Sequence, residues 1–248
     1  MQSLCSKSVQ FGSEKYLNLL AQVQNMTDKA RIDAFIENPE EKVEQKLLDP
    51  AYLEMYKKEI INRTSSYRGT TQISIVDSDG NMASMTSSNG EGSGVMIPGT
   101  GIMLNNMLGE KDLNPGGFHR WQPDQRVTSM MAPGILKMTN GTCVVFGSGG
   151  SNRIRTAILQ VLLNLIDFEM SLEQAVSSPR IHFEDGQLNA EIGFDPDQLS
   201  KLADHYSDVK IWKEKSLFFG GAHSAGMGPD GFTGAGDVRR GGVSLVVE

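Results

Sequence analysis

The sequence has few cysteines, no excess of basic residues and no long apolar run, and each shortage excludes a class of protein. Cys5 and Cys143 are the only cysteines among 248 residues, which are too few for a disulfide scaffold or a thiolate metal site. The 23 Lys and Arg residues are outnumbered by 30 Asp and Glu residues, so the surface lacks the positive charge that binds phosphate groups. We therefore expect no nucleic-acid partner.

Long hydrophobic segments are missing as well. The most apolar region, residues 154–168, is interrupted by Arg155, Gln160, Asn164 and Asp167, and residues 1–7 lead into no apolar segment. A membrane-spanning helix needs about 20 predominantly apolar residues. The sequence thus predicts neither a membrane span nor an export signal, and by default a cytoplasmic location.

The signatures of several common sites are also absent. The four histidines show neither the HxxxH nor the HExxH spacing of zinc ligands, and the GxSxG elbow of serine hydrolases does not occur. Residues 77–81 resemble the start of a calcium loop, but Met82 and Ser88 stand where that loop requires Gly and Glu. Residues 147–151 lack the Lys of a P-loop and the third Gly of a dinucleotide-binding loop. We expect no metal ion and no nucleotide.

Glycine divides the sequence into two parts of unlike composition. Residues 1–69 contain two of the 27 glycines and ten residues of each charge, whereas residues 70–248 contain the other 25 glycines and the whole acidic excess. Helical recurrence of apolar residues, and an Asp-Pro helix start at residues 49–50, predict helices over 14–24, 28–36 and 52–61. We therefore divide the chain into a helical segment, 1–69, and a second region, 70–248.

The second region alternates strand and helix patterns. Turn residues predict hairpins at 77–80, 139–141 and 229–231, and residues 242–247 are predicted to form a closing strand. Helices are predicted over 152–168, from Asp195 to Tyr206 with a capping-box spacing to Gln198, and from Ser171 over a short distance. This order favours an α+β fold with helices layered on antiparallel sheets.

Two segments rich in small residues could carry chemistry. Gly149 and Gly150 precede a predicted helix, where backbone N–H groups attract a phosphate, a carboxylate or an oxyanion, although a close-packed turn explains them equally well. The other segment, residues 69–72, contains Thr70 at the compositional boundary. A threonine hydroxyl becomes a nucleophile when the free α-amino group of the same residue acts as its base. From the residues alone, β-branched side chains starting a strand are the better explanation.

From Thr70 onward the sequence resembles the small subunit of the γ-glutamyltranspeptidase family, N-terminal-nucleophile hydrolases whose precursor cleaves itself into two subunits. The resemblance rests on six segments in the same order, residues 70–81, 101–106, 126–133, 147–154, 178–180 and 228–237. It implies an α+β fold, the αββα sandwich, present here only in part. Residues 1–69 match the C-terminal end of the large subunit.

The resemblance also implies roles for individual residues. Thr70 would be the nucleophile after cleavage of the Gly69–Thr70 bond, Ser88 a second hydroxyl that hydrogen-bonds it, and Gly149 and Gly150 the oxyanion hole. The residues implied to bind substrate are Asn89 for the γ-glutamyl group, Glu110 for the α-ammonium, and Thr128 and Ser129 for the α-carboxylate. The resemblance implies no cofactor.

Departures from the family pattern leave the substrate open. Met107 stands where family members have Gln or Glu, Glu110 where Asp is common, and Gln72 where His is common. We expect cleavage of γ-glutamyl amides of the glutathione type through an acyl-threonine. A catalytically silent or incomplete homologue and an amidase or acylase with a different acyl group remain alternatives.

The resemblance further implies a partner besides the amide substrate. Family precursors are longer than this sequence, and their large subunit supplies sheet strands and an arginine that pairs with the substrate α-carboxylate. We expect this portion to come from the same protein or from a separate chain, and the isolated chain to have little activity. Association into a homo-oligomer stays open.

Overall fold

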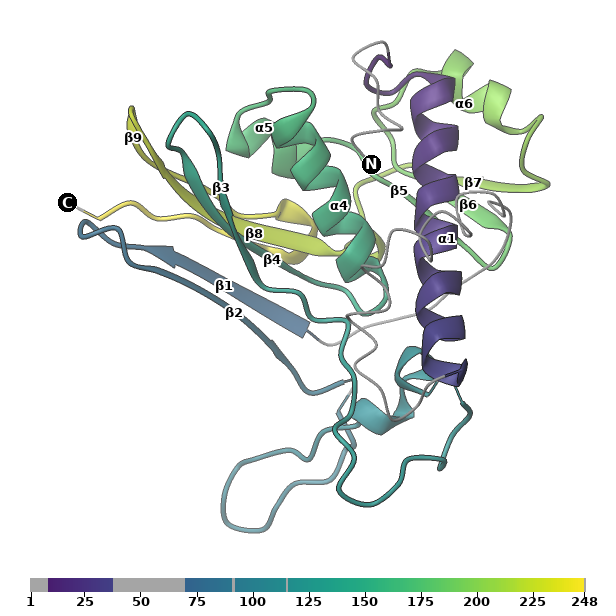
Figure 1. Cartoon of the computed structure of the whole chain (residues 1–248), viewed down its shortest axis with the longest axis vertical. Coiled ribbons are helices and arrows are strands. Elements are labelled where there is room, and N and C mark those ends of the chain that lie inside the picture. Colours follow the sequence, from purple (N-terminus) through teal and green to yellow (C-terminus); the bar gives the residue numbers. More distant parts are fainter. Residues whose placement is uncertain (1–8, 38–69, 91, 115, 248) are drawn as a thin grey trace. The chain divides into compact units, whose positions relative to one another are not determined.

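The computed structural model describes residues 9–37, 70–90, 92–114 and 116–247 (Figure 1). The chain divides into two compact units. The first consists of Met1–Ser65, Lys111–Val127 and Ile181–Lys213. The second consists of Ser66–Glu110, Thr128–Arg180 and Glu214–Glu248. The predicted helix over 52–61 lies outside the described residues. The predicted division of the chain at residue 69 stays a prediction.

The described part of the first unit contains two α-helices and a small mixed sheet. Its helices are α1 (Glu14–Glu37) and α6 (Pro196–Leu202), and its strands are β5 (Ile181–Glu184), β6 (Gln187–Ala190) and β7 (Asp208–Ile211). The predicted helical stretches before residue 37 are confirmed as the single helix α1. Strands β5 and β6 pair antiparallel, while β6 and β7 pair parallel, with α6 in the connection between them. The sequence did not predict this parallel pair.

Helix α6 is shorter than predicted. It ends at Leu202 instead of reaching Tyr206. Asp195 caps it by accepting a hydrogen bond from the backbone N–H of Asp197. The predicted capping box is not completed. The carboxamide oxygen of Gln198 accepts instead from the backbone N–H of Glu14, at 2.8 Å. A tertiary partner at the start of α1 has replaced the local one. Among the described helices, none is both long and apolar enough to cross a membrane.

The second unit has three layers. Its central sheet has the order β3-β4-β8-β9 and is made of β3 (Gly134–Lys137), β4 (Cys143–Gly149), β8 (Gly221–Gly228) and β9 (Gly231–Ala235). Helices α4 (Arg153–Ile166) and α5 (Leu172–Ser177) cover one face, and the hairpin of β1 (Thr70–Val76) and β2 (Met82–Ser88) lies at the other (Figure 1). The three predicted hairpins and the helices after residues 152 and 171 are confirmed, as is the α+β class.

Different interactions hold the two interfaces between these layers together. The helical side is apolar and includes Val144, Val161, Leu165 and Val176 in its core. On the hairpin side, serine hydroxyls donate to backbone carbonyl oxygens of the central sheet: Ser84 to Phe146 at 2.7 Å and Ser74 to His223 at 2.9 Å. Strand β4 is therefore covered on both faces, which explains why nearly all of its side chains are buried.

The predicted closing strand over 242–247 is wrong. These residues are irregular, and Val243, Leu245 and Val247 are 76–87% exposed. A Cβ at Gly236 would collide with the backbone of Gly242, and one at Gly234 would come too close to the Cβ of Ser244, so this segment packs closely on β9 but forms no strand with it. An apolar run forms a strand only where a neighbouring strand can pair with it.

Candidate active site

Thr70 and Ser88 face each other at the open end of the β1–β2 hairpin. They are direct partners in the strand register, so their side chains lie on the same face of the hairpin. The hydroxyl of Thr70 donates to the hydroxyl of Ser88 across 3.0 Å, and Ser88 Oγ also accepts from the backbone N–H of Gly90 at 3.2 Å. The structure thus brings the two predicted hydroxyls together, while Gly69 lies outside the described residues.

Glycines at the end of β4 allow the main chain to come close to Thr70. A Cβ at Gly149 would collide with the carbonyl oxygen of Thr70. Gly150 has a φ of 133°, and a Cβ there would lie 2.7 Å from the Cα of Gly220. Helix α4 begins shortly afterwards, at Arg153, without a side-chain N-cap. Thr70 and Gly149 are therefore in contact, and glycine is required at both positions of the predicted oxyanion hole.

Glu110 lies beside this glycine loop. Its Oε2 accepts a hydrogen bond of 2.9 Å from the hydroxyl of Ser151, the residue that follows Gly150. Ser151 is buried and has a φ of 54°, a backbone conformation that residues other than glycine seldom adopt. The loop conformation and the carboxylate position are thus coupled through one hydroxyl.

The other three residues predicted to bind substrate are less closely tied to the cluster. Asn89 directly follows Ser88, and its carbonyl oxygen accepts from the backbone N–H groups of Gly92 and Asn106. Thr128 and Ser129 have exposed side chains in an irregular segment before β3, where Ser129 Oγ accepts from the backbone N–H of Met131 at 3.1 Å. Within the described part of the chain, neither Thr128 nor Ser129 is hydrogen-bonded to Thr70.

The buried carboxamide of Gln72 fixes the hairpin two residues after Thr70. Its Nε2 donates to the hydroxyls of Ser74 and Ser84 at 2.9 Å each, and its Oε1 accepts from the hydroxyl of Thr86. A Cβ at Gly147 would collide with the carboxamide, so the amide packs directly on β4. The residue that departs from the family pattern therefore takes part in holding the hairpin against the central sheet.

Arg240 is a contact of Thr70 that the sequence analysis missed. Its Nη1 donates to the carbonyl oxygen of Thr70 at 2.6 Å, although the two residues are 170 positions apart. The side chain extends from the short 3₁₀ helix Val238–Arg240 past two glycines, because a Cβ at Gly149 or Gly221 would collide with it. The only sequence signal was the pair of adjacent arginines after the last segment of the resemblance.

A buried ion-pair cluster supports the same end of the sheet. Asp237 pairs with Arg180 at 2.8 Å and with Arg239 at 3.1 Å, and all three side chains are nearly inaccessible. Burial alone would raise the pKa of Asp237, but the two guanidinium groups and the N–H groups of Ala222 and Arg239 bring it below its ordinary value. Asp237 therefore stays ionised at neutral pH.

His223 joins this cluster to the central sheet. Its Nδ1 accepts from the backbone N–H of Asp237 at 3.2 Å, which assigns the ring proton of the neutral form to Nε2. Burial lowers the pKa of His223; Asp237 acts in the opposite direction, while Arg240 and Arg180 lower it further. The imidazole is therefore neutral near pH 7.

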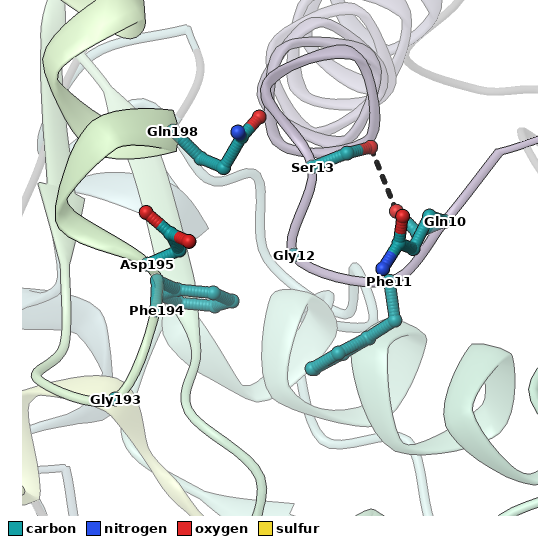
Figure 2. A pocket seen from close by; sticks show the side chains of 8 residues that line it. All are labelled: Gln10, Phe11, Gly12, Ser13, Gly193, Phe194, Asp195 and Gln198. Carbon is teal, nitrogen blue, oxygen red and sulfur yellow. Dashed lines mark hydrogen bonds between the residues drawn. The ribbon is translucent and has the colours of Figure 1, made fainter.

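A separate cavity lies in the first unit, between the starts of α1 and α6 (Figure 2). It measures about 240 Å³. Its polar groups serve local structure: Ser13 Oγ donates to the carbonyl oxygen of Gln10, while Asp195 and Gln198 accept from backbone N–H groups. The predicted catalytic residues that the structure describes all belong to the second unit. Within the described part of the chain, His, Cys, Asp and Glu side chains form no group of three that could hold a metal ion.

Comparisons with known proteins agree with this geometry. The sequence profile described as Gamma-glutamyltranspeptidase matches residues 2–247. The chain is 34% identical over 201 residues to the glutathione hydrolase proenzyme of Pseudomonas aeruginosa, covering 72% of this chain and 36% of that protein. It is 30% identical over 256 residues to the acylase ACY 1 proenzyme of Pseudomonas sp. strain SE83, covering 97% of this chain and 45% of the relative. The chain thus spans less than half the length of these curated relatives.

Solved structures show the same fold. The transpeptidase enzyme CapD of Bacillus anthracis is 28% identical, with a TM-score of 0.59 over 71% of this chain and 99% of that chain. The cephalosporin acylase of Bacillus halodurans is 27% identical, with a TM-score of 0.70 over 84% of this chain and 40% of that chain. The fold implied by the resemblance is confirmed by these similarities.

Proposed function

Because the chain belongs to the γ-glutamyltranspeptidase family, we propose that it carries the nucleophile of a hydrolase or acyltransferase acting on γ-glutamyl amides of the glutathione type. One observation carries the proposal: Thr70 is held at the start of β1 with its hydroxyl on Ser88 and its main chain against Gly149. A nucleophile, a second hydroxyl and a backbone oxyanion site are thereby assembled from β1, β2 and β4.

The first step is cleavage of the chain before Thr70. Thr70 Oγ1 attacks the carbonyl carbon of Gly69, the peptide C–N bond breaks, and an ester between Gly69 and Thr70 forms while the nitrogen gains a proton. Water then hydrolyses the ester, leaving a carboxylate on Gly69 and a free α-amino group on Thr70. The hydroxyl of Ser88 supports this step by holding the Thr70 hydroxyl in one orientation.

The free amino group then serves as the base for amide cleavage. It takes the proton of Thr70 Oγ1 as the oxygen attacks the substrate carbonyl carbon, and backbone N–H groups of Gly149 and Gly150 stabilise the resulting oxyanion. The intermediate collapses when the C–N bond breaks and the ammonium returns its proton to the leaving amine. Water or an acceptor amine resolves the acyl-threonine by the same route.

Substrate recognition follows from the groups around this centre. The Glu110 carboxylate, held by Ser151, binds the α-ammonium of the glutamyl group, and Asn89, Thr128 and Ser129 complete the contacts to its polar atoms. A different acyl group is a second candidate, because the similarity to the acylase ACY 1 proenzyme extends over 97% of the chain and Met107 offers an apolar contact.

We further propose that the remaining portion of a family precursor covers the outer face of the hairpin. The side chains of Ile73, Ile75 and Met85 on this face are 45–55% exposed. Contiguous apolar side chains at a surface mark a site of association. The partner would come from the same protein or from a separate chain.

The experiment is to express the chain together with the remaining portion of a family precursor and to record its intact mass. Two pieces meeting at Gly69–Thr70 are expected, together with release of the chromophore from a γ-glutamyl anilide. Thr70→Ala should give one uncut chain without turnover, whereas Thr71→Ala, whose side chain is exposed on the same strand, should behave as the wild type. Turnover that survives in Thr70→Ala would contradict the mechanism, and preference for acyl anilides without an α-amine would favour the acylase.

A further inference from the structure

We propose that Arg240 is a positioning residue that fixes the main chain of Thr70 and, once the Gly69–Thr70 bond is cut, keeps the new α-amino group unprotonated near neutral pH. The inference rests on the proposed function, because the amino group becomes free only by cleavage before Thr70. It goes beyond that function by assigning the activation of the base to a residue outside the hydroxyl pair and the glycine loop.

The contact is directed at the main chain of the nucleophile. Arg240 Nη1 donates to the carbonyl oxygen of Thr70 at 2.6 Å, so the guanidinium holds the residue whatever its side chain does. Gly149 and Gly221 leave the space that the arginine occupies, since a Cβ at either position would collide with its side chain. Two glycines and one arginine thus form a fitted contact at the end of β4.

The charge of Arg240 lies close to the amino group, because the guanidinium is bound to another atom of the same residue. The α-nitrogen and the carbonyl carbon are bonded to the same Cα, so a cation on the carbonyl oxygen lies a few ångströms from the nitrogen. A fixed positive charge at that distance disfavours a second positive charge and lowers the pKa of the ammonium. A base with a pKa nearer to the working pH is present more often in its reactive form.

The other charged groups around Thr70 do not offset this effect. Strand β2 contains no ionisable side chain, and the only one of β4, Cys143, lies at the opposite end of that strand. On β8, the ionisable side chain is His223, whose pKa is lowered by burial and by the nearby positive charges of Arg240 and Arg180. In the segment after β9, Arg239 is paired with Asp237. Arg180, which precedes β5, is paired with the same carboxylate.

The Glu110 carboxylate completes this set. It is held by Ser151 beside the glycine loop and is the same in every variant of Arg240, so a difference in pKa between these variants reports the charge at position 240. Among the residues that the structure describes, Arg240 is therefore the charged group that hydrogen-bonds the Thr70 main chain. Its guanidinium remains protonated at every pH at which the enzyme would work.

The test makes the Thr70 terminus independently of self-cleavage. Residues 66–69 are replaced by Ile-Glu-Gly-Arg, so that factor Xa opens the bond before Thr70 in the otherwise complete chain. The α-amino group is then titrated by the pH dependence of its acylation, which is read from the mass of the Thr70 peptide. Arg240→Gln and Arg240→Met remove the charge, and Arg240→Lys keeps it. Lys137→Gln, at an exposed position on β3, is the matched control.

With Arg240 present, the amino group should titrate below the ordinary value of about 8. Arg240→Gln and Arg240→Met should each raise its pKa by about one unit, whereas Arg240→Lys and Lys137→Gln should stay near the parent chain. Thermal unfolding of each variant shows which proteins are folded, and the pKa of the amino group is compared among those proteins. Equal values in all folded variants, or an equal rise in Arg240→Lys, would overturn the proposal.

Hydrolysis of a γ-glutamyl anilide supplies an independent check. The acid limb of kcat/KM should move to higher pH in Arg240→Gln and be restored in Arg240→Lys. Activity that does not depend on Thr70 would disprove the proposed function while the amine titration still decides the role of Arg240. A titration without a shift in a Thr70-dependent enzyme would disprove only the role of Arg240.

Discussion

The hydroxyl oxygens of Thr70 and Ser88 lie 3.0 Å apart because the two residues are opposite partners at one end of the β1–β2 hairpin. Their separation of 18 residues along the chain is closed by the turn at residues 77–80, in which the Asp77 carboxylate accepts from the backbone N–H groups of Asp79 and Asn81. A local turn far from the site thereby sets the geometry of the two hydroxyls.

Ser88→Ala should slow cleavage before Thr70. The substitution removes the acceptor of the Thr70 hydroxyl, and the loss of one such hydrogen bond, about 1 kcal/mol, corresponds to a rate lower by roughly fivefold to tenfold. A time course of intact mass in the complete assembly measures the rate. Ser87→Ala, whose side chain is exposed on the opposite face of β2, should cleave at the wild-type rate. Equal rates in all three proteins would remove Ser88 from the mechanism.

Glu110→Ala should weaken catalysis on γ-glutamyl substrates by about 1–3 kcal/mol in transition-state binding, mainly through KM. The substrate ammonium would lose its charged partner, and Ser151 would lose the acceptor of its hydroxyl. The comparison substrate is an acyl anilide of similar length without the α-amine, for which kcat/KM should change much less. If neither substrate distinguishes the variant from the wild type, Glu110 does not bind the ammonium.

Asp237→Asn should destabilise the second unit by about 3–5 kcal/mol, because it leaves the buried guanidinium groups of Arg180 and Arg239 without their counter-charge. Denaturant unfolding at pH 7 measures the loss, and Asp230→Asn, in an exposed turn, is the control. Since the folded-state pKa of Asp237 lies below its unfolded value of about 3.9, its stabilising contribution is complete above that pH. The difference between variant and wild type should shrink as the pH falls through the folded-state pKa.

Protonation of His223 should lower stability below about pH 6.5, the ordinary pKa of an unfolded histidine. The folded-state pKa is lower, so the unfolded chain binds more protons in the interval between the two values, and stability falls as the pH decreases through it. His223→Asn keeps an acceptor for the Asp237 N–H without a titrating ring. Denaturant midpoints between pH 7.5 and 5 should therefore depend less on pH in this variant, while His119→Asn, at an exposed position, should retain the wild-type slope.

Local features of the sequence were enough for much of the fold. Residues 77–80, 139–141 and 229–231 form turns from their own side chains and backbone preferences, and the hairpins around them are confirmed. The errors occur where a distant partner decides. Gln198 bonds to Glu14, 184 residues away, and not to its own cap, and residues 242–247 have the composition of a strand without strand pairing.

The candidate site shows the same division between local and distant information. Thr70, Ser88 and the glycine loop were predicted from ordered segments that resemble a family, and the hairpin register then places the two hydroxyls together. Arg240 was not predicted, because its hydrogen bond to Thr70 spans 170 residues and depends on space left by Gly149 and Gly221. Such a contact becomes visible only when β4, β8 and the segment after β9 are assembled.

Our last prediction is that this chain alone turns over γ-glutamyl anilides poorly. Ile73, Ile75 and Met85 expose 45–55% of their surface on the outer face of the hairpin that carries Thr70, which favours association or loosening of β1 and β2. A displacement of about 1 Å at the nucleophile can lower the rate a hundredfold. Addition of the remaining portion of a family precursor should restore turnover.

The surface and the activity can be separated with two variants. The double variant Ile73→Ser and Met85→Ser should reduce self-association of the isolated chain, measured by light scattering, and should also weaken activation by the added portion. Ile211→Ser changes an equally exposed isoleucine, in the first unit, and should do neither. The comparison shows whether the partner covers this hairpin face, because Ile211→Ser also removes exposed apolar surface but at another place. Rapid turnover by the monomeric wild-type chain, lost in Thr70→Ala, would contradict the prediction, because the site would then be complete without a covering partner.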